Sequence, residues 1–578
     1  MFRATWAKQL RRFATKAPQS TPKTSWIGYA LTAAIFTGVG AYAHTYKSTP
    51  QPIVNGKEDK SSFDVNDLTS PVYANAADFE TAVAQMAAIV GKDNVSRSEA
   101  ELVAHNDSFF ATHHPPDPSK QKPSVVIYPS STEEVSELLK IAFKYRVPVV
   151  ASSGLTSLEG QMMHTRGPHS VAISFTKNMA DIIAFHPEDL DVVVQPGVGW
   201  KELDDYLLDH PDGSHLMFGP DPGVGAAIGG MVSTSASGTN AYRYGTMKEA
   251  VVSMTVVLAD GQIIRTKQRP RKSSAGYDLT HLFIGAEGTL GLVTEITLKL
   301  HVRPKIEYVS IASFPTIKDA ASTASNVIGK SGLHPNAIEI LNEEMVMFVN
   351  ESGSVERKFD EKPTLLFKIG GHSEDNIKEQ ARIIQNIAQQ NNLIEWEIST
   401  SEEENQLLWS ARRQGLWSTI EYGKVVLEDP NDVQVWTTDI AVPISRLAQV
   451  IDETNADLNV DFKNKFSVMG HIGDGNCHFL IVYNSNDYGK CAAAVDRMVE
   501  RAIKYGGTCT GEHGVGIGKR KYLPLEYGES AVGFMRALKI GLDKRRILNP
   551  DKIVTIDPLD KLDEQLDYHG RQEWSCCK

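Results

Sequence analysis

The stretch at residues 219–238 consists mostly of glycine, alanine, serine and proline, although the flanking sequence has an ordinary globular composition. A linker would be less apolar and would not lead directly into Tyr242 and Tyr244. Small side chains allow a backbone to lie against a flat ligand. Gly223 and Gly225 superficially match a dinucleotide-binding loop, but the spacing is wrong and no strand precedes them, which excludes a nicotinamide Rossmann site. The stretch therefore predicts a folded domain whose backbone lines a ligand site.

Length and charge limit the classes of protein that the chain can represent. At 578 residues it predicts two or three domains with extensions. Residues 1–57 contain eight Lys or Arg and no acidic residue, so the remainder carries 51 basic and 71 acidic residues, a net charge of −20. Such a body repels polyanions, which argues against nucleic acid, and attracts a small cationic protein. The five cysteines include no C-x-x-C pair, so neither a zinc ribbon nor a disulfide scaffold is indicated.

The N-terminus has the composition of a targeting segment followed by an anchor. Residues 1–25 are rich in Arg and Lys and lack acidic groups, which is typical of a mitochondrial presequence. Residues 26–46 begin with eighteen uncharged residues, about enough to span a bilayer, although a buried helix or a longer presequence would also fit. We expect a single transmembrane helix in contact with inner-membrane lipid, with the rest of the chain in the intermembrane space. Residues 47–117 would then form a tether and an N-terminal helical segment.

The next segment has the pattern of a β-α-β unit. An apolar strand is predicted at 124–128, a helix begins at the capping box Ser131-Thr132-Glu133-Glu134, and a return strand is predicted at 147–150. The strand opens into a loop of Ser, Gly and Thr at 151–160, which would suit an anion cradle or a plain surface loop. Asp260-Gly261 predicts a β-hairpin further along.

Five motifs occur in a fixed order through this part of the chain: Gly154-x-Thr156-Ser157, Pro196-Gly197-Val198, Ile228-Gly229-Gly230, Tyr244-Gly245-Thr246 and Gly285-x-Glu287-Gly288-Thr289-Leu290-Gly291. Together they resemble the FAD-binding domain of the vanillyl-alcohol oxidase superfamily, the PCMH fold, over about 118–300. The resemblance implies a two-subdomain FAD-binding domain. It also implies non-covalent FAD, because the first loop has no His. The residues that it implies for FAD binding are Gly154, Thr156, Ser157, Pro196, Gly197, Val198, Ile228, Gly229, Gly230, Gly245, Glu287 and Gly288.

Two histidines and a glutamate in the second half suggest a metal site. His471 and His478 lie in a glycine-rich segment that runs into an apolar strand, and Glu512 follows about thirty residues later. Two His and one Glu are a ligand set for a catalytic divalent metal with an open position. The His-x6-His spacing is not that of a helical zinc protease, and a glycine-rich turn whose histidines bond the backbone is the alternative.

The second half predicts an α+β cap domain over 301–540 and a C-terminal return segment with a tail over 541–578. Strands are expected at 306–314 and 364–370, and helices at 373–390 and 444–458. Together with the two glycine-histidine motifs, this part resembles the C-terminal half of FAD-linked 2-hydroxy-acid dehydrogenases that act on D-isomers. The resemblance implies that His471, His478 and Glu512 bind a divalent metal (zinc or manganese), that Arg412 grips the substrate carboxylate, and that His513 is the base.

The resemblance also narrows the substrate. Relatives that act on 2-hydroxyglutarate usually carry Asn and Lys where this chain has Leu480 and Thr437. A short acid is therefore expected, with D-lactate oxidised to pyruvate and cytochrome c as the cationic acceptor. The alternatives are a D-2-hydroxyglutarate dehydrogenase, a flavin oxidase that uses oxygen, and a metal-binding membrane scaffold without catalysis.

Overall fold

The computed structural model describes residues 63–108 and 110–566. The expected presequence, the expected transmembrane helix and residues 47–62 of the expected tether lie outside these ranges, as does the end of the C-terminal tail. Within the described ranges, no helix has the length and apolarity that crossing a bilayer requires.

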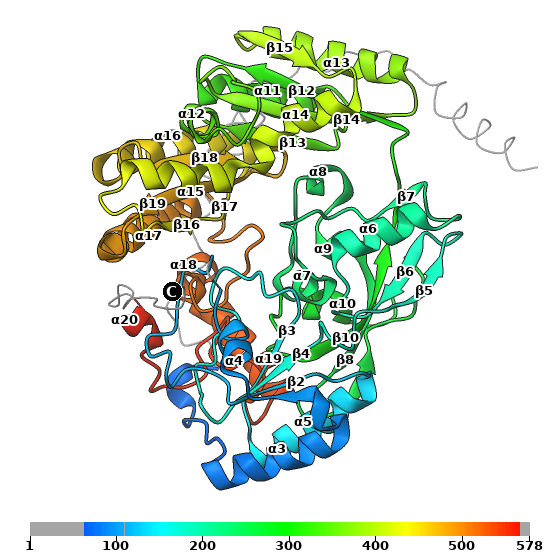
Figure 1. Ribbon diagram of the computed structural model, residues 1–578, viewed down its shortest axis with the longest axis vertical. Coiled ribbons are helices and arrows are strands. Elements are labelled where there is room, and N and C mark those ends of the chain that lie inside the picture. Colours follow the sequence, from blue (N-terminus) through cyan, green and yellow to red (C-terminus); the bar gives the residue numbers. More distant parts are fainter. Residues whose placement is uncertain (1–62, 109, 567–578) are drawn as a thin grey trace, which may run out of the picture. The chain divides into compact units, whose positions relative to one another are not determined.

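The first part of the chain builds a four-stranded sheet in the order β1-β2-β4-β3 (Figure 1). Its strands are β1 (Val95–Ser96), β2 (Val125–Ile127), β3 (Val149–Ser152) and β4 (Val171–Ser174). The predicted helix is α5 (Thr132–Tyr145), and its cap is present because Ser131 Oγ accepts from Glu134 N at 3.2 Å. Helix α5 packs on α3 (Ala76–Val90). The unit β2-α5-β3 is parallel as expected, but β4 lies between its two strands.

The second sheet of this part has five strands in the order β5-β6-β10-β8-β9. They are β5 (Ile182–His186), β6 (Asp191–Val194), β8 (Val251–Val257), β9 (Ile263–Arg265) and β10 (Leu292–Lys299). The predicted hairpin joins β8 to β9 in antiparallel register. The small-residue stretch forms α7 (Ile228–Thr234), whose Ile228, Met231 and Val232 belong to the core shared with β6, β8 and β10. The other helices are α6 (Trp200–Asp209), α8 (Ala241–Tyr244), α9 (Met247–Ala250) and α10 (Leu279–Phe283).

A short two-stranded sheet of β7 (Leu216–Met217) and β11 (His301–Val302) precedes the second half. That half contains an eight-stranded sheet in the order β15-β12-β14-β13-β18-β19-β16, with β17 paired to β19. The strands are β12 (Ile306–Ser313), β13 (Ala337–Leu341), β14 (Thr364–Gly371), β15 (Glu395–Ile398), β16 (Gln434–Thr437), β17 (Ile440–Ala441), β18 (Phe466–Gly470) and β19 (Asn476–Tyr483).

Helices cover both faces of this cap sheet (Figure 1). One core contains α11 (Ile317–Lys330), α13 (Glu374–Gln389), α16 (Ile444–Asp461) and α17 (Tyr488–Lys504). The other contains α12 (Glu343–Ser352) and α14 (Glu402–Arg413), with Leu416 of α15 (Gly415–Val426) packed against it. Alternation along β13 divides its residues between these cores, with Ile338 and Ile340 in the first and Ala337 and Leu341 in the second.

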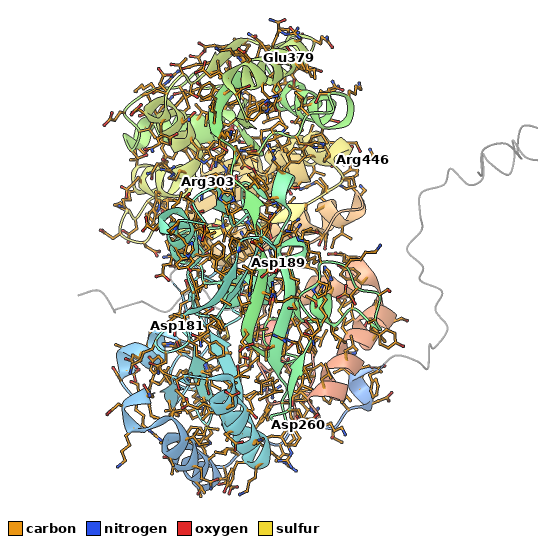
Figure 2. All side chains as sticks on the ribbon, turned by 90° about the vertical axis from the view of Figure 1, so that its right-hand side faces the viewer. Asp181, Asp189, Asp260, Arg303, Glu379 and Arg446 are labelled. Carbon is orange, nitrogen blue, oxygen red and sulfur yellow. The ribbon has the colours of Figure 1, made fainter. Side chains whose placement is uncertain are left out.

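The chain returns to the first part after α18 (Leu523–Tyr527) and α19 (Glu529–Leu542), before the short α20 (Leu562–Leu566). Val149 N donates to Ile547 O, and Asn549 N donates to Val149 O, which extends the sheet beside β3. Charged side chains such as Asp260 in the β8–β9 turn and Glu379 on α13 lie at the outer surface (Figure 2). The return segment thus joins the first half beside β3, and residues of both halves line one large cavity.

Candidate active site

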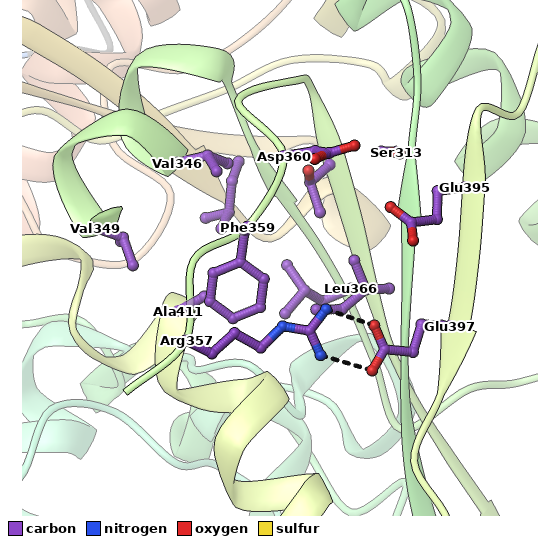
Figure 3. Close-up of a pocket in the computed structure, with 13 residues that line it drawn as sticks. Ser313, Val346, Val349, Arg357, Phe359, Asp360, Leu366, Glu395, Glu397 and Ala411 are labelled. Carbon is purple, nitrogen blue, oxygen red and sulfur yellow. Dashed lines mark hydrogen bonds and ion pairs between the residues drawn. The ribbon is translucent and has the colours of Figure 1, made fainter. Parts of the chain in front are cut away.

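The cavity has a volume of about 1100 Å³ and is lined by residues of both halves, from Gly154 and Pro196 to Arg412, His471 and His513. A second hollow lies on the cap sheet beside Phe359 and the Arg357–Glu397 ion pair (Figure 3). Its volume is about 30 Å³, which is room for about one water molecule. Of these two hollows, only the large cavity has room for a cofactor together with a substrate.

Small residues form the wall of the cavity that the first half contributes. A Cβ atom on Gly154 would lie 2.6 Å from Gly225 O and 2.7 Å from Ala227 N, so only glycine permits the two segments to touch. The small side chains, the Thr156 and Ser157 hydroxyls and the volume of this cradle fit FAD. The predicted cofactor residues that line it are Gly154, Thr156, Ser157, Pro196, Gly229, Gly230, Glu287 and Gly288.

Four other predicted cofactor residues do not line the cavity. Val198 and Ile228 are buried in the core beneath it. Gly197 packs against the backbone of Phe175, and Gly245 ends α8 with φ of 83°. These residues contribute to the packing and backbone turns that support the cradle.

His471, His478 and Glu512 come together at the cap side of the cavity. His471 follows β18, and His478 lies on β19, opposite Met469. Glu512 Oε1 lies 3.2 Å from Nε2 of each histidine. The αL turn at Gly475 (φ 74°) closes the hairpin between the two imidazoles, and a Cβ there would collide with Val442 O. The hairpin thus sets the spacing that the sequence displays as His-x6-His.

The outer nitrogens of both imidazoles are held by acceptors. His471 Nδ1 donates to Glu339 Oε1 at 2.7 Å, and His478 Nδ1 donates to Thr438 O at 2.9 Å. Both Nε2 atoms therefore face Glu512 Oε1. Burial alone would raise the pKa of Glu512, but His471 and His478 outweigh it and hold that pKa well below its usual range. Two oriented imidazoles and one ionised carboxylate fit a divalent cation.

Asp439 fixes the loop that carries Glu512 and His513. Its Oδ2 atom accepts from the backbone N–H groups of Gly511, Glu512 and His513 at 2.7–2.9 Å, and from Thr510 Oγ1 at 2.7 Å. Burial alone would raise the pKa of Asp439, but nearby His513 and Lys519 and the backbone donors hold it well below its usual range. One ionised carboxylate therefore sets the backbone on which two predicted site residues depend.

His513 and Arg412 line the same cavity as the histidine cluster. The His513 ring stacks on the His478 ring at 5.2 Å between centroids and 10° between planes. Arg412, in the last turn of α14, donates from Nε to Glu339 Oε2 at 2.6 Å. All five predicted catalytic and metal residues are thus brought together, while sequence reasoning missed Glu339. Asp439 was missed as a site residue as well, although it lies two residues after Thr437.

The residues used to infer a short substrate differ in position. Thr437 lines the cavity, whereas Leu480 is fully buried in a hydrophobic cluster with Leu408 and Met469 and does not line it. The cavity also contains Lys368, whose Nζ lies 4.4 Å from the centroid of the Trp409 ring. The sequence analysis did not identify Lys368 as a site residue, because it lies in a strand rather than in one of the glycine-rich motifs.

Glu287 connects the cofactor cradle to the loop after His513. Its carboxylate accepts from Val515 N at 2.6 Å and from Gly516 N at 2.9 Å, and the side chain is almost completely buried. Burial raises the pKa of Glu287 to about 7, against the lowering effect of these N–H donors. When a carboxyl has a higher pKa in the folded than in the unfolded protein, the protein loses stability as pH rises from the unfolded-state pKa to the folded-state pKa.

Replacing Glu287 with glutamine (E287Q) should therefore stabilise the protein at pH 8 and have little effect at pH 5. The pKa difference sets an upper bound of about 3 kcal/mol. Thermal unfolding of the flavin-loaded protein at both pH values checks this. A difference in melting temperature between variant and wild type that stays constant from pH 5 to pH 8 would contradict it.

Comparisons with known proteins agree with this arrangement. Residues 123–267 match the family described as "FAD binding domain", and residues 303–553 match "FAD linked oxidases, C-terminal domain". Among solved structures, 4-ethylphenol oxidase from Gulosibacter chungangensis has a TM-score of 0.67 at 19% identity, covering 85% of this chain and 99% of that one. That likeness shows the fold.

Two curated relatives are much more similar in sequence. "D-lactate dehydrogenase (cytochrome), mitochondrial" of Kluyveromyces lactis is 48% identical over 505 residues, which is 87% of this chain and 86% of that protein. "D-lactate dehydrogenase (cytochrome) 1, mitochondrial" of Saccharomyces cerevisiae is 44% identical over 563 residues, which is 95% of this chain and 94% of that protein. The chain therefore belongs to the FAD-linked oxidase family that contains these D-lactate dehydrogenases.

Proposed function

We propose that this chain is an FAD-dependent dehydrogenase that oxidises D-lactate to pyruvate and passes the electrons to cytochrome c. The observation that carries the proposal is that one cavity joins the glycine-rich cradle to Arg412, His513 and the His471–His478–Glu512 cluster. The names of the relatives from Kluyveromyces lactis and Saccharomyces cerevisiae support the substrate, the acceptor and a mitochondrial location.

Each group around the cavity has a role in this reaction. The cradle would hold FAD as hydride acceptor, and His471, His478 and Glu512 would hold a divalent ion, zinc or manganese, as Lewis acid for the hydroxyl. Arg412 binds the substrate carboxylate through its terminal amino groups, since its Nε is already bonded to Glu339. His513 takes the hydroxyl proton as the hydrogen on Cα leaves as hydride. The substrate thus loses one hydride and one proton and becomes a 2-oxo acid.

A spectroscopic experiment on the full-length chain tests the proposal. D-lactate added without oxygen should bleach the flavin absorbance, and L-lactate should not. Oxidised cytochrome c should then restore the absorbance faster than oxygen does. A flavin that D-lactate leaves oxidised would refute the proposed activity, and rapid hydrogen peroxide formation would refute the proposed acceptor.

One observation favours a longer acid as a second candidate substrate. Lys368 brings an additional positive charge into the cavity, where a distal carboxylate would be attracted. The lack of a positive charge at Thr437, which lines the cavity, favours D-lactate. The same bleaching series with D-2-hydroxyglutarate decides between them, because the physiological substrate should reduce the flavin faster at equal concentration.

The proposed location is the mitochondrial inner membrane, with the catalytic body in the intermembrane space. The basic start and apolar stretch of residues 1–46 support this, as does the net charge of −20 on the remaining chain, which would attract cytochrome c. Protease protection in intact and swollen mitochondria tests the location. Digestion only after inner-membrane rupture would place the body in the matrix and contradict the proposal.

A further inference from the structure

Glu339 occupies a position where its neighbours along the strand are apolar. It lies in the middle of β13, between Ile338 and Ile340, and alternation turns it to the side of Ala337 and Leu341. That side packs against α14. Its side chain is 0% exposed, and burying an unpaired carboxylate there would cost several kcal/mol. A carboxylate at such a position requires specific partners.

The two partners of Glu339 belong to different parts of the proposed active site. Oε2 accepts from Arg412 Nε at 2.6 Å, and Oε1 accepts from His471 Nδ1 at 2.7 Å. Arg412 comes from the end of α14, while His471 follows β18, which pairs with β13 through Ile340 and Gly470. A single side chain therefore joins the group expected to bind the substrate carboxylate to the group expected to bind the metal.

Each hydrogen bond leaves the partner in one useful orientation. With Nε occupied, Arg412 has its two terminal amino groups available, of which Nη1 also contacts Met469 Sδ at 3.4 Å. With Nδ1 donating to Glu339, His471 directs its Nε2 atom towards Glu512. Arg412 and His471 are thereby held at a fixed separation, because they bond the two oxygens of the same carboxylate.

We propose that Glu339 is a positioning residue that couples substrate-carboxylate binding to metal binding by orienting Arg412 and His471 together. The proposal rests on the function given above. It assigns no contact with the substrate to Glu339, which acts through its two partners.

Glutamine at position 339 distinguishes this role from simple space filling. Arg412 Nε and His471 Nδ1 are both donors, and a carboxylate offers each of them an acceptor. The amide of glutamine offers one acceptor and one donor, so one of the two partners must rotate or change tautomer. Aspartate keeps the charge but is one methylene shorter, so it cannot reach both partners.

The test compares E339Q and E339D with wild type as flavin-loaded, full-length proteins. E339Q should raise the dissociation constant for Mn²⁺ or Zn²⁺, measured by titration after chelation, by about 10–100-fold. It should also raise KM for D-lactate more than it lowers kcat at saturating metal. E339D should retain either metal affinity or KM, but not both. In the double variant E339Q/R412K, the effect on KM should be smaller than the product of the single effects.

The matched control is E397Q, in the same sheet. Glu397 on β15 forms a two-bond ion pair with Arg357, at 2.6 and 2.7 Å, outside the large cavity (Figure 3). E397Q should leave metal affinity and KM unchanged. If E339Q and E339D match E397Q in both quantities, the proposal is overturned. If E339Q does not fold, E339D alone decides. A wild-type flavin that D-lactate fails to bleach would instead refute the proposed function, so the two failures are distinguishable.

Discussion

Replacing His513 with glutamine (H513Q) is expected to lower the rate of flavin reduction by D-lactate about 10²–10⁴-fold. His513 is the proposed base, and its backbone is fixed by Asp439 and by Gln161, whose Nε2 donates to His513 O at 2.8 Å. Glutamine keeps the length and polarity of the side chain but cannot accept a full proton. Metal and flavin contents should remain those of wild type, because His513 lies outside the His471–His478–Glu512 cluster.

Anaerobic stopped-flow measurement of flavin bleaching, with metal analysis of the same sample, checks this expectation. The matched control is H281Q, because His281 lies on α10 at the surface and does not line the cavity. A reduction rate of H513Q within threefold of wild type would show that another group takes the proton. A loss of metal in H513Q would show that His513 serves as a ligand.

Local structure was the part of the fold that the sequence specified well. The helix N-cap at Ser131, the Asp260-Gly261 turn and the strands around 306–314 and 364–370 depend on neighbouring residues, and the structure contains each of them. Glu134, predicted to complete a capping box with Ser131, accepts from Ser130 N instead. The order of the strands was not predictable in this way. β4 pairs with both β2 and β3 and lies between them. The residues next to β2 and β3 in the sequence do not indicate this order.

In the candidate site, too, residues close together in the sequence could be predicted and distant ones could not. His471 and His478 are only seven positions apart, and their glycine-rich turn predicted a metal site that the geometry now supports. Glu339 lies 132 positions before His471, on a strand whose other residues are apolar, so its sequence neighbourhood resembles any buried strand. Residues that orient a site through long-range hydrogen bonds leave no spacing pattern behind. Resemblance to a family supplied the roles of Arg412 and His513, which composition and periodicity alone did not.

Glu512 is the residue whose replacement should most affect the metal. In E512Q the oxygen that lies 3.2 Å from both histidines keeps its place, but the negative charge is lost. A divalent cation would then have only neutral protein ligands, so the purified variant should contain little metal at wild-type flavin content. Losing several kcal/mol of transition-state stabilisation should slow flavin reduction on the order of 10³-fold.

Chelation and metal replacement separate this effect from a folding defect. Wild type treated with a chelator should lose flavin reduction to the same extent as E512Q and regain it with Mn²⁺ or Zn²⁺, whereas E512Q should need far higher metal concentrations. E500Q, an exposed position on α17, is the control for a lost surface charge. Full metal content in E512Q, or full activity in chelated wild type, would contradict the metal site. The backbone N–H groups of Glu512 and His513 both donate to the Asp439 carboxylate. D439N should therefore impair metal binding and proton transfer together, whereas E512Q should affect metal binding and H513Q proton transfer alone.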